Sequence, residues 1–211
     1  MDLMDLVNQQ LTGPRLSQMS RQLGISEDQT REALPAALAA LTGAMAQNAA
    51  QPQGAQQLSN ALSKDHDGSL LDSLDGFLGG IGGMGGMGGM GGAGGGNLGA
   101  GASILGHVFG QRQQKVEGNL GRATGLDPQT VARLLALLAP IVMAYLGRQQ
   151  RQKQLDPGGL ADVLGQQRQR IEQVPQARSG LGALLDLDGD GQVMDDLANL
   201  AGGLFGNKRQ Q

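Results

Sequence analysis

The apolar residues near the start of the chain recur at the spacing of α-helices. They predict a helix over residues 2–10, a second over residues 15–23, and a third that begins after Ser26. Gly24 is the residue type that ends helices in a left-handed conformation. Ser26 and Gln29 have the spacing of a capping box, in which each side chain accepts a hydrogen bond from the other residue's backbone N–H.

The third helix continues its apolar stripe past Pro35, so we expect this proline either to kink the helix or to begin a new one. The longest apolar run, residues 134–147, includes Pro140 and is shorter than the roughly 20 residues that cross a bilayer. We expect a buried helix there and no membrane span. Ala, Leu, Gln and Arg dominate outside the glycine-rich tract and β-branched runs are missing, so the sequence predicts an all-α fold.

The second part of the chain resembles the first. A shift of 101 residues aligns apolar, glycine and capping positions: Val7 with Val108, Arg21 with Arg122, Gly24 with Gly125, Ser26 with Asp127, and Leu34 with Leu135. Further on, HDGSLLDSL at residues 66–74 matches DPGGLADVL at residues 156–164. The pattern indicates two related small helical units, a duplicated helical bundle.

Between the two units the chain reads GGIGGMGGMGGMGGAGGG. Glycine loses the most backbone entropy on ordering and has no side chain to bury, so we expect a flexible linker. We divide the chain into an N-terminal helical unit (1–78), a Gly/Met-rich linker (79–101), a C-terminal helical unit (102–178) and a segment with an acidic loop and a short amphipathic helix (179–211).

Met84, Met87 and Met90 recur every three residues in this tract. Thioethers at such spacing are one way to bind Cu(I). No cysteine or nearby histidine supports a copper site, so we prefer the linker interpretation. Packing of glycine strands between chains at three residues per turn is a third interpretation.

Charge divides the chain unevenly. Residues 1–98 carry four Lys/Arg and nine Asp/Glu, whereas residues 99–211 carry twelve and ten. Units of opposite charge attract each other within a chain or between chains, and salt weakens that attraction. The chain has no cysteine, which excludes disulfides and Cys-based zinc sites. Its start is acidic and lacks the basic region of a secretory signal, so we expect a cytoplasmic protein.

Three segments resemble a known bacterial family: LGISEDQTREALPAAL, HDGSLLDSLDGFLGG and NLGRATGLDPQTVARLLALLAPIVMAYLGRQQ. They are similar to the YidB-like family of bacterial proteins, one of the domain-of-unknown-function families. They lie on both sides of the glycine tract, between residues 23 and 150. The resemblance implies a cytosolic, all-helical fold and implies no known reaction.

Alternating acidic residues near the C-terminus suggest a metal loop. Asp186, Asp188 and Asp190, followed by glycine, match the first half of an EF-hand loop. The twelfth position, which holds a bidentate acid in the standard loop, is Leu197; Asp195 at the tenth position resembles instead the shortened calcium loop of the excalibur family. The expected ligands of a weak Ca²⁺ site are Asp186, Asp188, Asp190, Gln192 (through its carbonyl) and Asp195.

A structural turn is the competing interpretation of this loop. DHDGSLLDSL, which starts at Asp65, matches DGDGQVMDDL, which starts at Asp188, but lacks the preceding aspartate and has Ser63 there. In this interpretation the motif is a turn whose aspartate caps the helix that follows it.

Residues 16–34 have the pattern of a helix-turn-helix, which in DNA-binding proteins places its second helix in the major groove. That helix begins with Glu27, Asp28 and Glu32 against Arg31, and phosphate would repel it. We therefore do not expect nucleic-acid binding, and we keep a DNA-binding regulator only as an alternative.

Catalytic motifs are scarce. His66 and His107 fall in different units, and no nucleophile motif such as GxSxG and no phosphate-binding GxxxxGK accompanies them. We expect a non-enzymatic protein that binds a protein partner or self-associates. A Ca²⁺-binding protein that uses the acidic loop is the first alternative.

The acidic loop generates a direct prediction. Four carboxylates and one carbonyl would bind calcium weakly, and we expect calorimetric titration of the full chain with calcium to give saturable heat. If no heat appears at millimolar calcium, the loop is a structural turn.

Overall fold

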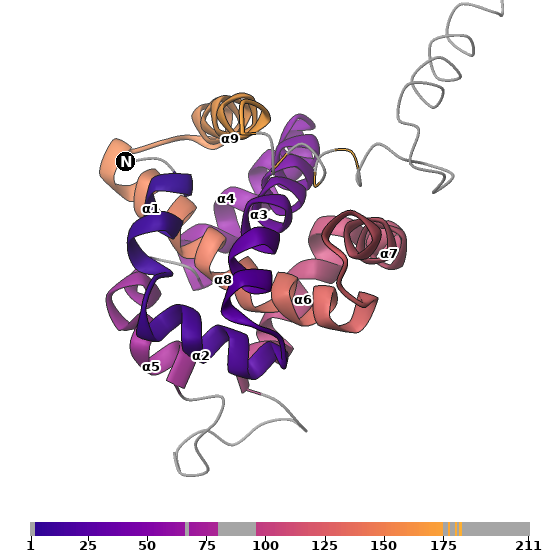
Figure 1. Cartoon of the computed structure of the whole chain (residues 1–211). Coiled ribbons are helices and arrows are strands. Elements are labelled where there is room, and N and C mark those ends of the chain that lie inside the picture. The colour runs from indigo at the N-terminus through magenta and orange to yellow at the C-terminus, as the bar shows by residue number, and fades with distance from the viewer. Residues whose placement is uncertain are drawn as a thin grey trace, which may run out of the picture.

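The computed structural model describes residues 3–65, 68–79, 96–174, 177, 180 and 182. Within these residues the chain is helical and has no strand, which confirms the predicted all-α class (Figure 1). The helices are α1 (Leu3–Gln10), α2 (Pro14–Leu23), α3 (Glu27–Ala49), α4 (Pro52–Asp65), η1 (Ser69–Ser73), α5 (Leu74–Gly79), α6 (Gly96–Phe109), η2 (Gly110–Arg112), α7 (Gln113–Thr124), α8 (Pro128–Lys153) and α9 (Pro157–Glu172).

Local sequence signals set the corner between α2 and α3. Gly24 ends α2 with φ 72°, a left-handed conformation that glycine adopts without strain. The predicted capping box is confirmed: the Ser26 hydroxyl accepts from the Gln29 N–H at 3.1 Å, and the Gln29 side chain accepts from the Ser26 N–H at 3.1 Å. Two otherwise unpaired donors at the start of α3 are thereby satisfied.

The corner between α7 and α8 has the same design. Gly125 ends α7 with φ 72°, and Pro128 stands in the first turn of α8, where its missing N–H costs nothing. The Asp127 carboxylate accepts hydrogen bonds from the Thr130 hydroxyl at 2.5 Å and the Thr130 N–H at 3.0 Å. These bonds stabilise the charged form and lower the pKa of Asp127.

Both long helices continue through their internal prolines. α3 passes Pro35 and α8 passes Pro140 without ending, so the expectation that Pro35 begins a new helix is wrong. Each proline removes one backbone hydrogen bond, a local cost. The helices are held by tertiary burial, since α3 is almost continuously buried from Ala33 to Met45.

Helix α4 was not expected from the sequence. Only Ala50 and Gln51 separate α3 from α4. The two helices meet closely: a Cβ on Gly54 would lie 2.0 Å from the Asn48 carbonyl oxygen. Glycine is therefore needed at position 54 to allow this turn between helices.

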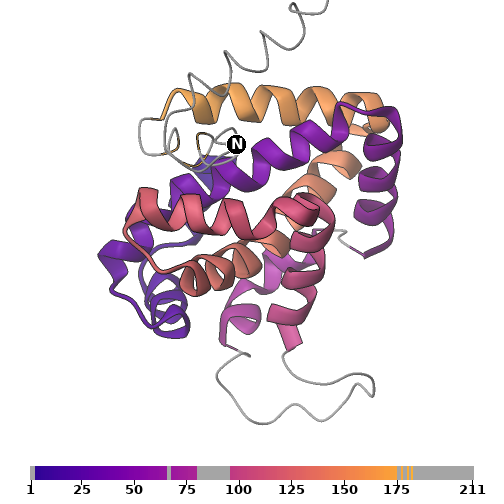
Figure 2. The ribbon, with the colours of Figure 1, turned by 90° about the vertical axis from the view of Figure 1, so that its right-hand side faces the viewer.

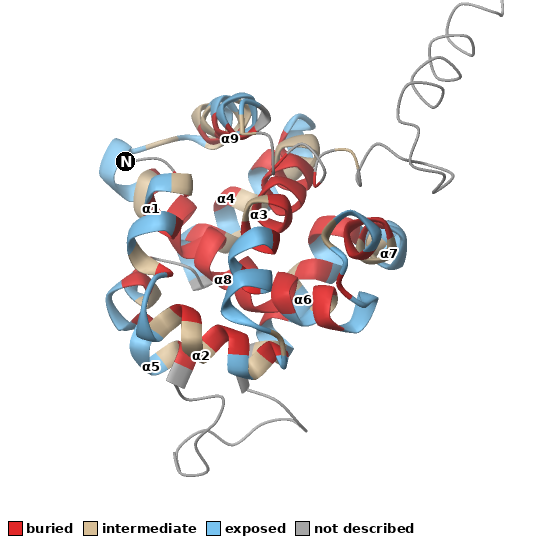
Figure 3. Cartoon of the chain, in the orientation of Figure 1, coloured by how far each residue is buried: buried red, intermediate tan, exposed pale blue. Residues whose placement is uncertain are grey.

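α3 and α8 form the centre of the molecule. One cluster of buried apolar side chains includes residues from both sides of the glycine tract, and Figure 3 shows the burial concentrated on these two helices. Among the described helices, α8 is long and apolar enough to cross a membrane, but 89% of its most apolar window is buried inside the protein. That burial agrees with the buried helix predicted for residues 134–147.

Glycine also permits close contact between α6 and α8. A Cβ on Gly101 would lie 1.9 Å from the backbone oxygen of Ala136. Residues 96–101, which the sequence assigns to the linker, thus belong to α6, and Gly101 is buried. The other long helix, α3, has a similar close contact. A Cβ on Gly180, after α9, would lie 1.9 Å from the backbone oxygen of Ala36 in α3.

Gly101→Ala tests this close packing. The added methyl has no space against the α8 backbone, so we expect the free energy of unfolding to fall by about 2–3 kcal/mol. Gly99→Ala is the matched control, because nothing lies within 4 Å of its Cβ position in the same helix. Alanine favours helix over glycine by up to about 1 kcal/mol, so the control should be neutral or stabilising in denaturant unfolding. Equal effects of the two substitutions would contradict the packing.

Candidate interaction surfaces

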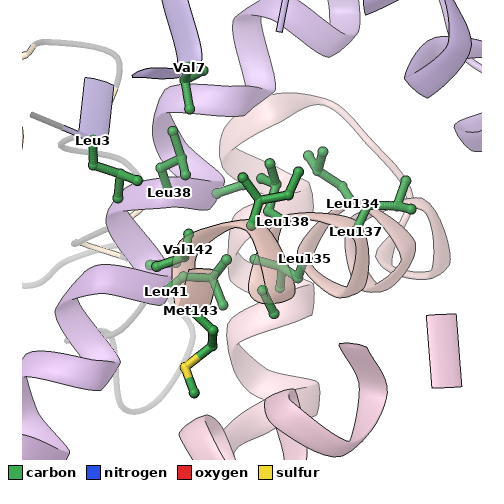
Figure 4. Packing of buried hydrophobic residues seen from close by; sticks show 14 of the residues in the cluster. Leu3, Val7, Leu38, Leu41, Leu134, Leu135, Leu137, Leu138, Val142 and Met143 are labelled. Carbon is green, nitrogen blue, oxygen red and sulfur yellow. The ribbon is translucent and has the colours of Figure 1, made fainter. Parts of the chain in front are cut away.

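An apolar surface buried inside the chain joins an N-terminal half (described residues 3–79) to a C-terminal half (described residues 96–182). At its centre Leu38 and Leu41 of α3 meet Leu138 and Val142 of α8 (Figure 4). All four side chains have no exposed area. Each such burial contributes about 1.5–3 kcal/mol, so this surface is a principal source of stability.

An element near the end of each half covers the long helix of the other half. α9 lies along α3, as Figure 2 shows, and Ile171 packs with Ala39 and Ala177 in a small buried cluster. In the reverse direction η1 lies on α8. A Cβ on Gly68 would be 2.9 Å from the Arg148 Cβ, which shows how closely these two elements approach.

An ion pair accompanies the contact between η1 and α8. The Arg148 Nη2 atom lies 2.5 Å from a carboxylate oxygen of Asp72. The two side chains are 37% and 71% exposed. A pair exposed to this degree contributes only about 0–1 kcal/mol to the stability of the fold. Its main effect is to orient η1 against α8.

Buried and half-buried hydrogen bonds also cross between the halves. The Gln150 amide donates to the Ser59 hydroxyl at 2.7 Å, and the Asn48 amide donates to the Val108 carbonyl at 2.9 Å. The Leu3 N–H donates to the Gln167 side chain at 3.3 Å, which joins α1 to α9. A shift of one half against the other would leave these groups unpaired at about 1–3 kcal/mol each, so the bonds fix the register.

The expected helix-turn-helix shape is present at the corner of α2 and α3, but most of its second helix is unavailable. Exposed residues lie only in its first turns and include Glu27, Asp28 and Glu32. Arg31 pairs with Asp28 at 2.8 Å. Because α3 is buried beyond this point, only these first turns of the helix face solvent.

A surface groove lies between the C-terminal part of α3 and α9. Its volume is about 500 Å³. Small residues line it on both sides, with Ala46 and Ala50 from α3 and Ala161 and Gly165 from α9. Two helix backbones are thus accessible at one place on the surface.

The predicted calcium ligands Asp186, Asp188, Asp190, Gln192 and Asp195 lie outside the described residues, as do His66 and the three methionines of the tract. Within the described part of the chain, no group of three or more His, Cys, Asp or Glu could hold a metal ion. His107 lies on α6, where its Nδ1 atom is 2.9 Å from the Ser103 carbonyl oxygen. This local contact explains its position without a ligand.

Sequence reasoning missed the polar residues that join the halves. Gln150 and Ser59 carry no motif, and neither residue suggests a partner 91 positions away. A usable signal existed for α4, since Pro52 precedes Ala55, Leu58 and Leu62 at helical spacing.

Residues 5–149 match a family of bacterial proteins of unknown function, DUF937. The chain belongs to this family, which confirms the membership of a bacterial family of unknown function expected from the sequence. No curated protein and no solved structure shows a significant match to the chain.

Proposed function

We propose that this protein is a non-enzymatic self-association module, in which the N-terminal half of one copy packs with the C-terminal half of another. The observation that supports this is the reciprocal cover of the long helices: α9 lies on α3, and η1 lies on α8. Neither half closes its own core. Each half therefore presents an apolar face whose complement is the other half, in the same chain or in a second copy.

A duplicated origin of the halves supports the same proposal. The helix corners at Gly24 and Gly125 share the same φ of 72°. The contacts of α9 with α3 and of η1 with α8 place an element of each half on the long helix of the other. Two copies of one unit that pair through a common face make such reciprocal contacts, as in a twofold dimer.

The segment between the halves offers little to confine them to one chain. Residues 80–95 consist of glycine with three methionines, one isoleucine and one alanine. This composition provides no apolar stripe that would bury against either half. A closed monomer and an exchanged dimer would make the same core contacts, so the protein concentration would decide between them.

Complementary lesions in the full chain test the exchange. Leu41→Asp and Val142→Asp each bury an unpaired carboxylate in a different half, and each alone should lose about 4 kcal/mol or more of stability. When the two variants refold together, the intact halves can pair. We expect a cooperative unfolding transition to return, together with a 1:1 dimer in light scattering.

The matched control places both lesions in one half. Leu38→Asp refolded with Leu41→Asp leaves two damaged N-terminal halves and should give no recovery. If the mixture of Leu41→Asp and Val142→Asp unfolds as each variant does alone and forms no dimer, the halves do not exchange and the proposal fails.

Two other functions remain proposals with weaker support. Calcium binding rests on the sequence of the acidic loop, and the titration described above tests it. A DNA-binding regulator has the corner of α2 and α3 in its favour, but its exposed first turn is acidic and phosphate repels it. A cytoplasmic location remains the expectation from the sequence.

A further inference from the structure

The groove between α3 and α9 is lined by small and polar residues. The small ones are Ala46, Ala50, Ala161 and Gly165, of which Ala46, Ala161 and Gly165 are half-buried, and the polar ones are Asp162, Arg168 and Gln169. Nothing lies within 4 Å of a Cβ placed on Gly165, so the groove is open there. Small residues on two neighbouring helices leave room for the larger apolar side chains of an amphipathic helix, the usual mode of helix recognition in a groove.

The chain itself contains a segment of matching pattern. Residues 193–205 read VMDDLANLAGGLF. Val193, Leu197, Leu200 and Leu204 would form one apolar face if the segment is helical, because their spacings of four, three and four residues follow the helical period. We propose that residues 193–205 bind in the groove between α3 and α9 of the same chain.

The described part of the chain ends close enough for this. After α9 the chain returns to α3, where Ala177 packs with Ala39 and Gly180 contacts Ala36. From Ala36 to Ala46 the distance along α3 is about 15 Å, at 1.5 Å per helical residue. Residues 183–192 span up to about 33 Å when extended, so the segment reaches the groove.

Charge favours one direction of binding. Arg168 and Gln169 line the groove toward the end of α9, whereas the acidic Asp162 lines it nearer the start of that helix. α9 ends beside Ala39, where the described chain returns to α3. A segment that arrives from this side brings its acidic start, Asp195 and Asp196, to the end where Arg168 lies. Opposite charges at this end attract, while Leu200 and Leu204 continue toward the alanines.

Paramagnetic relaxation in the full chain tests the proposal. The protein has no cysteine, so Asn199→Cys gives a single site for a nitroxide label on the polar side of the segment. We expect strong broadening of the amide signals of Ala46, Ala161 and Gly165. The amides of α5 should keep their intensity, because α5 and α9 lie at opposite ends of the molecule (Figure 1).

Two variants separate docking from nonspecific proximity. Leu197→Asp with Leu200→Asp removes the apolar face of the segment, and Gly165→Leu fills the groove. Both should restore the groove signals while the unfolding midpoint of the helical body stays unchanged. Equal broadening before and after these changes overturns the proposal, as does the absence of broadening in the groove.

Isotope dilution identifies which chain supplies the segment. When ¹⁵N-labelled protein without a nitroxide is mixed with unlabelled protein that carries it, groove signals should remain sharp. Broadening in this mixture alone would mean that a second copy fills the groove, which overturns docking within one chain. The mixture is measured at a concentration at which light scattering shows a monomer, because in an exchanged dimer α3 and α9 of one groove would come from different copies.

Discussion

The packing of α3 against α8 is the contact on which the other elements depend. Both helices are apolar on several sides, with continuous burial from Ala36 to Met45 in α3 and from Leu134 to Gly147 in α8. A helix that is apolar all round must be covered all round. Each of the two therefore needs partners beyond its own neighbours in sequence, and each obtains them from the opposite half.

This requirement explains the use of small residues. The core holds few aromatic side chains, since the whole chain has three phenylalanines, one tyrosine and no tryptophan. Alanine and glycine allow backbones to approach until a Cβ no longer fits, as at Gly101 and Gly180. Close backbone contact thus substitutes for the area that large side chains would bury.

Local features of the fold were predictable because their causes lie within a few residues. The capping box at Ser26, the helix end at Gly24 and the proline start at Pro128 all follow from short sequence signals. The buried character of α8 follows from its long apolar run, because such a run must be covered.

Contacts between distant residues were not predictable in the same way. Nothing in the sequence pairs Gln150 with Ser59 or Arg148 with Asp72, because a polar residue does not specify a distant partner. The repeat predicts two helical units joined by a linker. Periodicity describes single helices, so it does not show which half covers which helix. The groove likewise arises only when α3 and α9, which are far apart in sequence, are brought together.

Native-state hydrogen exchange tests the shared core most directly. If α3 and α8 depend on each other, the slowest amides of residues 36–45 and 134–147 will exchange with the same free energy, equal to that of global unfolding. A destabilising change in either helix will lower both values together. Exchange from α3 at a clearly lower free energy than from α8 would show that the halves unfold separately, and would contradict a core built jointly by both.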